Sequence, residues 1–250
     1  MTRAAAALFA VALLGGCQAS PICACAQVAP PPLNIFAAVS LAPAFQKIAI
    51  EFSHAAFDPQ FTFAGTQTLT TQITEGASAD VFASADITHM EAIQNAGLLA
   101  GDPQIFAHNR LEIVVAKGNP KGISSLADLT RPGIVVVLAD PSVPAGKYAQ
   151  QALAKARVTV NPASLELQVT GVLTKVQLGE ADAGIVYVSD IFTSTSVDGV
   201  PIQDDQNVLA DYPIGALKNS DHPAEARAFI DYVLSPEGQG ILKASGFLGA

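Results

Sequence analysis

Apolar and polar positions along the chain follow two alternating periods from residue 33 onward. Short runs rich in β-branched and aromatic residues, typical of strands, alternate with segments whose apolar residues recur every three or four positions, typical of helices. Strands are expected at residues 33–39, 61–66, 80–85, 111–116, 133–140, 183–188 and 208–217, and helices at 41–52, 67–75, 86–96, 123–129, 147–156, 169–178, 223–234 and 236–244. This alternation predicts an α/β fold built from βα units.

Two of the expected strands are placed to join two lobes. Residues 111–116 and 208–216 are long strand-like segments that can each pass from one lobe to the other. One lobe would then be discontinuous in sequence and the other contiguous, with a cleft between them. The chain after residue 32 is long enough for two such lobes to bury substantial apolar surface.

The N-terminal residues have the layout of a secretory signal peptide, expected to cover residues 1–16. Arg3 precedes an apolar run that is too short to span a bilayer, and a Gly-Gly pair stands directly before Cys17. The small pair before a cysteine resembles the lipobox of bacterial lipoproteins, so Cys17 is expected to become the lipidated first residue of the mature chain. An ordinary signal peptide, cleaved nearer Ala26, is the alternative.

Residues 17–32 are expected to form a tether, because they show no apolar periodicity and end in three prolines, which favour extended chain. Cys23 and Cys25 lie in this tether. Two cysteines without further cysteines or a histidine cluster lack the ligand count of a zinc site, and whether they pair with each other stays open. No cysteine follows residue 25, so the folded body uses neither disulfides nor thiol chemistry.

The formal net charge of −9 limits the partners of the protein. A nucleic acid would be repelled, so no nucleic-acid partner is expected. An anionic ligand would also be repelled at long range. Any anion site in this chain must therefore act through short-range, oriented hydrogen bonds.

Catalytic templates are missing from the sequence: there is no nucleophile elbow, no paired metal-binding histidine motif, no Walker loop and no dinucleotide-binding glycine motif. The four histidines are scattered among polar neighbours rather than clustered as metal ligands, and they are His54, His89, His108 and His222. The sequence therefore does not indicate an enzyme or a direct metal site.

A strand that leads straight into a helix start with small or hydroxyl residues recurs three times, around Ser40, Thr66 and Ala145. A helix start presents unpaired N–H groups and the positive end of a dipole, which suits an anion without any charged side chain. Ser40 is expected as the N-cap of its helix, at the carboxyl end of a strand. The alternative is that Ser40 and Thr66 only cap their helices.

Five segments together resemble, in the same order, the molybdate-binding proteins of ABC importers. They are Phe-Ala-Ala-Val-Ser-Leu (36–41), Phe-Ala-Gly-Thr-Gln-Thr-Leu (63–69), Ala-Asp-Val-Phe-Ala-Ser-Ala-Asp (79–86), Asp-Pro-Ser-Val-Pro-Ala-Gly-Lys-Tyr-Ala (140–149) and Gly-Ile-Val-Tyr-Val-Ser-Asp (184–190). The resemblance covers the chain from Leu33 to the C-terminus and implies a type II periplasmic-binding-protein-like fold. Each of its two lobes has a mixed β-sheet flanked by helices, and the ligand lies in the cleft. Lobe 1 is expected at residues 33–112 and 214–250, and lobe 2 at 113–213.

The same resemblance implies a ligand set for a bound oxyanion, molybdate or tungstate. Ser40 and Thr66 match hydroxyl ligands, Ala145 and Val169 match residues that bind through backbone N–H groups, and Tyr187 matches a tyrosine whose phenol reaches the anion. Val169 departs most from the family pattern, because the common acidic residue before the valine is missing. No cofactor is expected. Lys147, Asp86 and Asp190 are not counted among the ligands.

The resemblance further implies an exported, monomeric lipoprotein on the outer face of the cell membrane, tethered through Cys17, that delivers its ligand to an importer permease. The alternatives are a binding protein for another solute, such as sulfate or a small carboxylate, and an enzyme on the same fold. A carboxylate ligand favours an arginine fork, and the arginines after the tether stand away from the candidate loops, at Arg110, Arg131, Arg157 and Arg227.

Overall fold

The computed structural model describes residues 32–52, 58–192 and 194–250. The expected signal peptide (1–16), the candidate lipidation site Cys17, the pair Cys23 and Cys25, and His54 lie outside the described residues, as does all of the expected tether except Pro32.

Most strands and helices follow the predicted alternation. The helix expected at 123–129 is instead a 3₁₀ helix at Leu126–Thr130, and the strand expected at 111–116 begins earlier, at Gln104. The strands are β1 (Pro32–Ala38), β2 (Asp58–Ala64), β3 (Val81–Ala83), β4 (Gln104–Ala116), β5 (Val136–Ala139), β6 (Ser164–Glu166), β7 (Ala183–Tyr187), β8 (Val197–Pro201), β9 (Leu209–Ala216) and β10 (Leu248–Gly249). The α-helices are α1 (Ala42–Phe52), α2 (Thr66–Thr74), α3 (Ile87–Asn95), α4 (Pro144–Ala156), α5 (Val169–Gln177), α6 (Val188–Phe192), α7 (Pro223–Leu234) and α8 (Pro236–Lys243), and the 3₁₀ helices are η1 (Val39–Leu41) and η3 (Leu126–Thr130).

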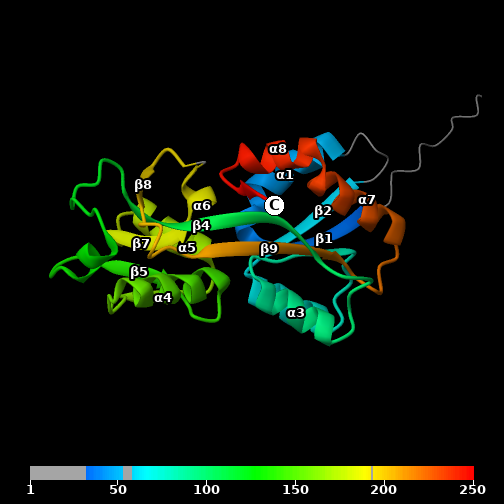
Figure 1. Cartoon of the computed structure of the whole chain (residues 1–250), viewed down its shortest axis with the longest axis horizontal. Coiled ribbons are helices and arrows are strands. Elements are labelled where there is room, and N and C mark those ends of the chain that lie inside the picture. Colours follow the sequence, from blue (N-terminus) through cyan, green and yellow to red (C-terminus); the bar gives the residue numbers. More distant parts are fainter. Residues whose placement is uncertain (1–31, 53–57, 193) are drawn as a thin grey trace, which may run out of the picture.

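The strands form a mixed sheet in the order β2-β1-β3-β9-β4-β7-β5-β6, with β8 and β10 also paired to β4. Strands β1, β2 and β3 are parallel to one another, as are β5, β6 and β7, whereas β4 and β9 run antiparallel to their neighbours. Helices flank the sheet on both sides (Figure 1). The expected α/β class with mixed, helix-flanked sheets is therefore confirmed.

The long strand β4 runs between the two halves of the molecule, with β9 beside it (Figure 1). Its first part, residues 104–110, pairs with β9, and its second part, residues 111–116, pairs with β7 and β8. We call the part built on β1, β2, β3 and β9 the first half and the part built on β5, β6, β7 and β8 the second half. The expected lobe limits stay a prediction, because the sheet continues through both halves without a break.

Apolar helix faces hold this arrangement together. Phe45 and Ile48 of α1 are fully buried, and the rings of Phe45 and Phe229 meet edge to face with centroids 5.8 Å apart. Burial of such side chains contributes about 1.5–3 kcal/mol each. A smaller cluster under α2 and α3 includes Leu69 and Met90. The apolar periodicity of the sequence thus predicts the buried faces correctly.

Several expected helix ends are also confirmed. Gly97 and Gly179 follow α3 and α5 with φ angles of +70° and +74°, a left-handed conformation that glycine adopts without a steric penalty. Helix α4 begins at Pro144, three residues before the expected start at 147, because proline at the first helical position lacks an N–H that would have no partner there anyway.

Close contact between β7 and α5 depends on another glycine. A Cβ on Gly184 would lie 2.3 Å from Cγ1 of Val172, so only glycine lets the helix approach the strand this closely. This contact fixes where α5 begins relative to the sheet.

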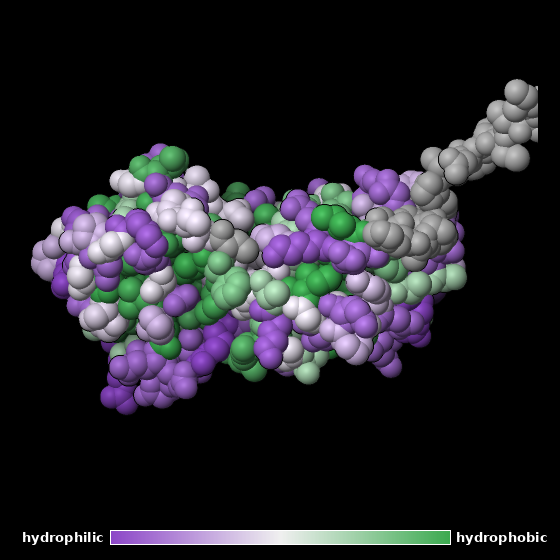
Figure 2. Space-filling model, turned by 90° about the horizontal axis from the view of Figure 1, so that it is seen from above, coloured by the Kyte–Doolittle hydropathy of each residue, from purple (hydrophilic) through white to green (hydrophobic). Residues whose placement is uncertain are grey.

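On the face drawn in Figure 2, hydrophilic residues cover much of the surface and apolar residues are exposed in small groups. Over residues 32–52, 58–192 and 194–250, no helix is both long and apolar enough to cross a membrane.

Candidate functional site

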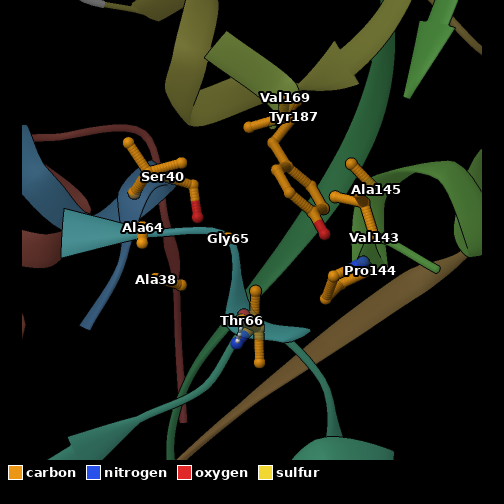
Figure 3. Close-up of a pocket in the computed structure, with 12 residues that line it drawn as sticks. Ala38, Ser40, Ala64, Gly65, Thr66, Val143, Pro144, Ala145, Val169 and Tyr187 are labelled. Atoms are coloured by element: carbon orange, nitrogen blue, oxygen red, sulfur yellow. Dashed lines mark hydrogen bonds between the residues drawn. The ribbon is translucent and has the colours of Figure 1, made fainter. Parts of the chain in front are cut away.

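A pocket lies where the first turns of four helices meet. The five residues that the sequence predicts as ligands, Ser40, Thr66, Ala145, Val169 and Tyr187, all line it. Ala38, Val39, Ala64, Gly65, Ala85, Val143 and Pro144 complete the lining. Ser40 and Thr66 belong to the first half, and the other three predicted residues belong to the second half. Figure 3 shows the hydroxyls of Ser40 and Tyr187 pointing into the same space.

Three of the helices that border the pocket start without a side-chain cap. The N-cap residues of α2, α4 and α5 are Gly65, Val143 and Gln168, and none of them accepts a hydrogen bond from its helix through its side chain. Asp86 caps α3 and Ser235 caps α8 through their side chains, whereas α7, which does not border the pocket, also starts without a side-chain cap. The first N–H groups of an α-helix have no intrahelical acceptor. The uncapped starts therefore direct free donors and the positive ends of three helix dipoles toward the pocket.

Ser40 does not cap a helix, contrary to the prediction from the sequence. Ala38 is the N-cap of η1, and Ser40 is the second residue of that 3₁₀ helix. Its hydroxyl oxygen lies 3.1 Å from the phenol oxygen of Tyr212, and both residues are buried. The serine oxygen can therefore accept from Tyr212 while the serine hydrogen is directed into the pocket.

Thr66 is likewise the first residue of α2 rather than its cap, which is Gly65. Its hydroxyl oxygen accepts a hydrogen bond of 3.2 Å from the backbone N–H of Ala85. Because that oxygen already has a donor, the hydroxyl hydrogen is available for a second partner. The alternative that Ser40 and Thr66 serve only as helix caps is wrong for both residues.

Tyr187 carries a buried hydroxyl that has no hydrogen-bond partner within the described part of the chain. An unpaired buried hydroxyl costs about 1–3 kcal/mol, and such groups are rare in folded proteins. Burial, and to a smaller extent the neighbouring phenol of Tyr212, raises the pKa of this phenol well above its ordinary value, so the oxygen keeps its proton. The phenol O–H of Tyr187 can therefore donate a hydrogen bond to a ligand in the pocket.

The pocket combines these donors with a neutral, narrow interior. Among the described residues that line it, none carries a charged side chain. The space between its walls is narrow, so only a compact guest fits between the halves as they stand. A ring of N–H and O–H donors around a small space suits an acceptor-rich ion.

The buried carboxylates of Asp86 and Asp190, which are close in sequence to pocket-lining residues, each accept a backbone hydrogen bond. Asp190 accepts a hydrogen bond of 2.9 Å from the backbone N–H of Tyr187, and burial raises the pKa of its carboxyl to about 7. Asp86 accepts from the backbone N–H of His89 at 3.0 Å and lies 2.8 Å from the ring of that histidine. His108 lies beside Asp211 in a similar pair. Among residues 32–52, 58–192 and 194–250, no three metal-binding side chains gather into a group.

Two polar contacts bridge the halves beside the pocket. The side-chain amide of Gln67 donates to the backbone oxygen of Leu167 at 2.9 Å. The ammonium of Lys147 donates to the hydroxyl of Thr88 at 2.6 Å, so this lysine spans the halves and does not line the pocket. Both contacts hold the two halves against each other at the pocket.

Sequence reasoning missed Tyr212. The tyrosine lies on β9, 172 positions from Ser40, and no local motif marks it. A tyrosine on a segment expected to cross between lobes is the one signal that the sequence offers. The missed Gln67 has a weaker signal, since it directly follows Thr66 in a segment that resembles the family.

Comparison with known proteins identifies the family. A model of bacterial extracellular solute-binding proteins matches residues 33–248. The molybdate-binding protein ModA of Mycobacterium tuberculosis (strain ATCC 25618 / H37Rv) is 47% identical over 216 residues, which cover 85% of this chain and 83% of that protein. ModA of Escherichia coli (strain K12) is 34% identical over 227 residues, covering 86% and 88% of the two chains.

Solved structures with the same fold include binding proteins for two oxyanions. The periplasmic molybdate-binding protein of Azotobacter vinelandii superposes with a TM-score of 0.74 at 18% identity, covering 87% of this chain and 99% of that one. The sulfate-binding protein SubI of Mycobacterium tuberculosis H37Rv gives 0.77 at 18% identity, covering 87% and 86%. At these identities the likeness concerns the fold. The resemblance inferred from the five sequence segments is confirmed by the closer relatives, which are solute-binding proteins and not enzymes. The chain therefore belongs to the bacterial extracellular solute-binding protein family, as a binding protein of the ABC-importer type.

Proposed function

We propose that this protein captures molybdate in the pocket between its halves and delivers it to an ABC importer permease. The observation that carries the proposal is the buried phenol of Tyr187, which lacks a partner among the described residues and faces a pocket lined by uncapped helix starts. A tetrahedral oxyanion offers four acceptor oxygens to these donors. The identity of 47% with a molybdate-binding relative supports the choice of ion.

In this proposal the ligands are the hydroxyls of Ser40, Thr66 and Tyr187 and the backbone N–H groups of Ala145 and Val169. Hydrogen bonds to charged groups contribute roughly 1.5–3 kcal/mol each. Five or more such bonds outweigh the free-energy cost of ordering the side chains and closing the halves. The expected dissociation constant then lies between micromolar and nanomolar. The ion touches both halves, so its binding favours the closed arrangement.

Selectivity follows from the direction of the donors. Phosphate carries a proton near neutral pH, and a bound P–OH group needs an acceptor, whereas the three hydroxyls have their hydrogens free to point inward. Phosphate is therefore bound weakly.

The size of the ion separates the remaining candidates. Tungstate has nearly the size and charge of molybdate, so it binds as well. Sulfate has the right charge but is smaller and fills the pocket less well. It is the second candidate, favoured by the likeness of the fold to a sulfate-binding protein.

The test is parallel calorimetric titration of residues 33–250 with molybdate, tungstate, sulfate and phosphate. Molybdate and tungstate are expected to bind one ion per chain, sulfate at least tenfold more weakly, and phosphate most weakly of the four. Tight binding of sulfate with no heat from molybdate would replace molybdate by sulfate in the proposal. No heat from any of the four ions contradicts the oxyanion function.

The proposed location is the outer face of the cell membrane, with the chain working as a monomer held by a lipid on Cys17. The support is the signal-peptide layout of residues 1–16 and the Gly-Gly pair before Cys17. Expression of the full chain with a radiolabelled fatty acid is expected to label the wild type and not Cys17→Ala. Equal labelling of both, or an N-terminus at or beyond residue 26 by mass spectrometry, contradicts the anchor.

A further inference from the structure

Tyr212 lies behind the pocket, in contact with it through Ser40. Its side chain is fully buried, and its phenol oxygen lies 3.1 Å from the hydroxyl oxygen of Ser40. The residue is on β9, the strand of the first half that pairs with the crossing strand β4, and it does not line the pocket. Its ring also meets that of Tyr187 edge to face, with centroids 5.8 Å apart and planes at 70°.

The direction of the bond between Tyr212 and Ser40 decides what Ser40 can do. A serine hydroxyl has one hydrogen. If Ser40 donated that hydrogen to Tyr212, it would turn a lone pair toward the pocket and repel an anion. If Tyr212 donates, the serine hydrogen is left for the pocket. A phenol is the stronger acid of the two groups and the better donor. Burial raises the pKa of Tyr212 by more than its contacts with Ser40, Asn109 and Tyr187 lower it, so the phenol keeps its proton.

We propose that Tyr212 is a positioning residue that donates to Ser40 and so fixes Ser40 as a hydrogen-bond donor toward the bound oxyanion. This inference rests on the proposed function. A chain of hydrogen bonds that all point toward a negative charge polarises each member, which strengthens the last bond in the chain. Thr66 has the same arrangement, since it accepts from the backbone N–H of Ala85.

If Tyr212 donates to Ser40, it affects which anions the pocket selects. A Tyr212 that only filled space in the core would not have this effect. When Tyr212 donates to Ser40, the serine oxygen is less able to accept a hydrogen from a protonated anion. Removing the phenol oxygen frees that acceptor. The variant Tyr212→Phe is therefore expected to lose affinity for molybdate and, at the same time, to discriminate less against hydrogen phosphate. A loosened core would weaken all anions alike.

The experiment is a calorimetric cycle of four proteins: wild type, Tyr212→Phe, Ser40→Ala and the double variant. The phenylalanine keeps the ring contacts with Phe106 and Phe247. Tyr212→Phe is expected to bind molybdate about tenfold more weakly than wild type, and the double variant no more weakly than Ser40→Ala alone. Tyr232→Phe, on helix α7, is the matched control and should bind like wild type.

A second measurement keeps the test independent of core stability. Replacing Tyr212 by 3-fluorotyrosine retains the hydroxyl but makes it a stronger donor and a weaker acceptor. Affinity for molybdate is expected to rise severalfold if Tyr212 donates to Ser40. A fall in the affinity of the 3-fluorotyrosine protein, additive losses in the double variant, or an equal loss for molybdate and phosphate in Tyr212→Phe would overturn the inference.

Should the wild type bind sulfate in place of molybdate, sulfate is the ligand for the same comparison. Failure of the wild type to bind any oxyanion would refute the proposed function itself and this inference with it.

Discussion

Ser40 and Tyr187 come from opposite halves of the molecule and present buried hydroxyls to one pocket (Figure 3). Ser40 follows strand β1 of the first half, and Tyr187 ends strand β7 of the second. A ligand that accepts hydrogen bonds from both must therefore hold the halves together. Substitutions on either side of the pocket are accordingly expected to change affinity.

Tyr187→Phe is expected to weaken ligand binding without lowering the stability of the unliganded protein. In the proposed site, loss of the phenol removes one charge-assisted hydrogen bond to the ion, so affinity for molybdate is expected to fall roughly 10- to 100-fold. The unliganded protein should melt at the same or a slightly higher temperature, because a buried hydroxyl without a partner among the described residues has been removed. Titration calorimetry and thermal melts measure the two effects, with Tyr232→Phe as the control. Unchanged affinity would exclude Tyr187 as a ligand.

Gly146→Ala tests the position of the α4 start. A Cβ at this residue would lie 2.1 Å from the backbone oxygen of Asp140, so the helix start must shift. The backbone N–H of the neighbouring Ala145 would shift with it, and affinity for molybdate is expected to fall at least tenfold. Gly240→Ala, in α8, is the control, because a Cβ there meets nothing within 4 Å. Wild-type affinity in Gly146→Ala would show that the α4 start does not contribute.

Asp190 makes stability depend on pH. Burial raises its pKa to about 7, from an ordinary value near 3.8. Between about pH 4 and pH 7 the unfolded chain has lost this proton and the folded chain keeps it, so the contribution of Asp190 to stability is lost as pH rises through this window. Each unit of pKa difference corresponds to about 1.4 kcal/mol.

The variant Asp190→Asn checks this dependence in the unliganded protein. It retains an acceptor for the backbone N–H of Tyr187 but cannot titrate. Urea midpoints at pH 5 and pH 8 are expected to differ less in Asp190→Asn than in wild type, whereas the exposed Asp205→Asn should behave like wild type. An equal pH dependence in all three proteins would mean that Asp190 is ionised throughout.

Lys147 is expected to govern release rather than capture. Its ammonium bridges to Thr88 across the halves, 2.6 Å from the hydroxyl oxygen. An exposed hydrogen bond of this kind contributes about 0.5–1.5 kcal/mol. Lys147→Met should therefore speed the dissociation of molybdate about fivefold in stopped-flow measurements, with little change in the association rate. The exposed Lys218→Met serves as the control, and equal dissociation rates in the two variants would contradict the bridge.

Local patterns account for most of the fold. The period of apolar residues places α7 and α5 within a residue of their observed ends, and glycines mark where α3 and α5 stop. The patterns do not reveal strands β6, β8 and β10, of two to five residues, or the five-residue helix α6, because such short segments do not show a period. The expected start of α4 at residue 147 is three residues late, because a helix accepts proline at its first position and the observed helix begins at Pro144.

The sequence predicts which residues line the pocket but does not predict the hydrogen bonds that they make. Resemblance to a family marks Ser40, Thr66, Ala145, Val169 and Tyr187, and the fold brings all five together. Their roles as ligands stay a prediction. The bond between Ser40 and Tyr212 joins residues 172 positions apart and depends on how η1 packs against β9, which no local pattern specifies.

The dependence of molybdate affinity on salt tests the central claim most directly, since a countercharge site and a neutral-donor site respond differently. The pocket has no charged residue among the described residues that line it, and the chain carries a net charge of −9. Calorimetric titration at about 20 mM and about 300 mM sodium chloride spans strong and weak electrostatic interaction. We predict an affinity that is unchanged or slightly higher at the higher salt concentration, because screening removes only the repulsion between the ion and the acidic protein. A severalfold loss of affinity at high salt would show that positive side chains, and not neutral donors, hold the ion.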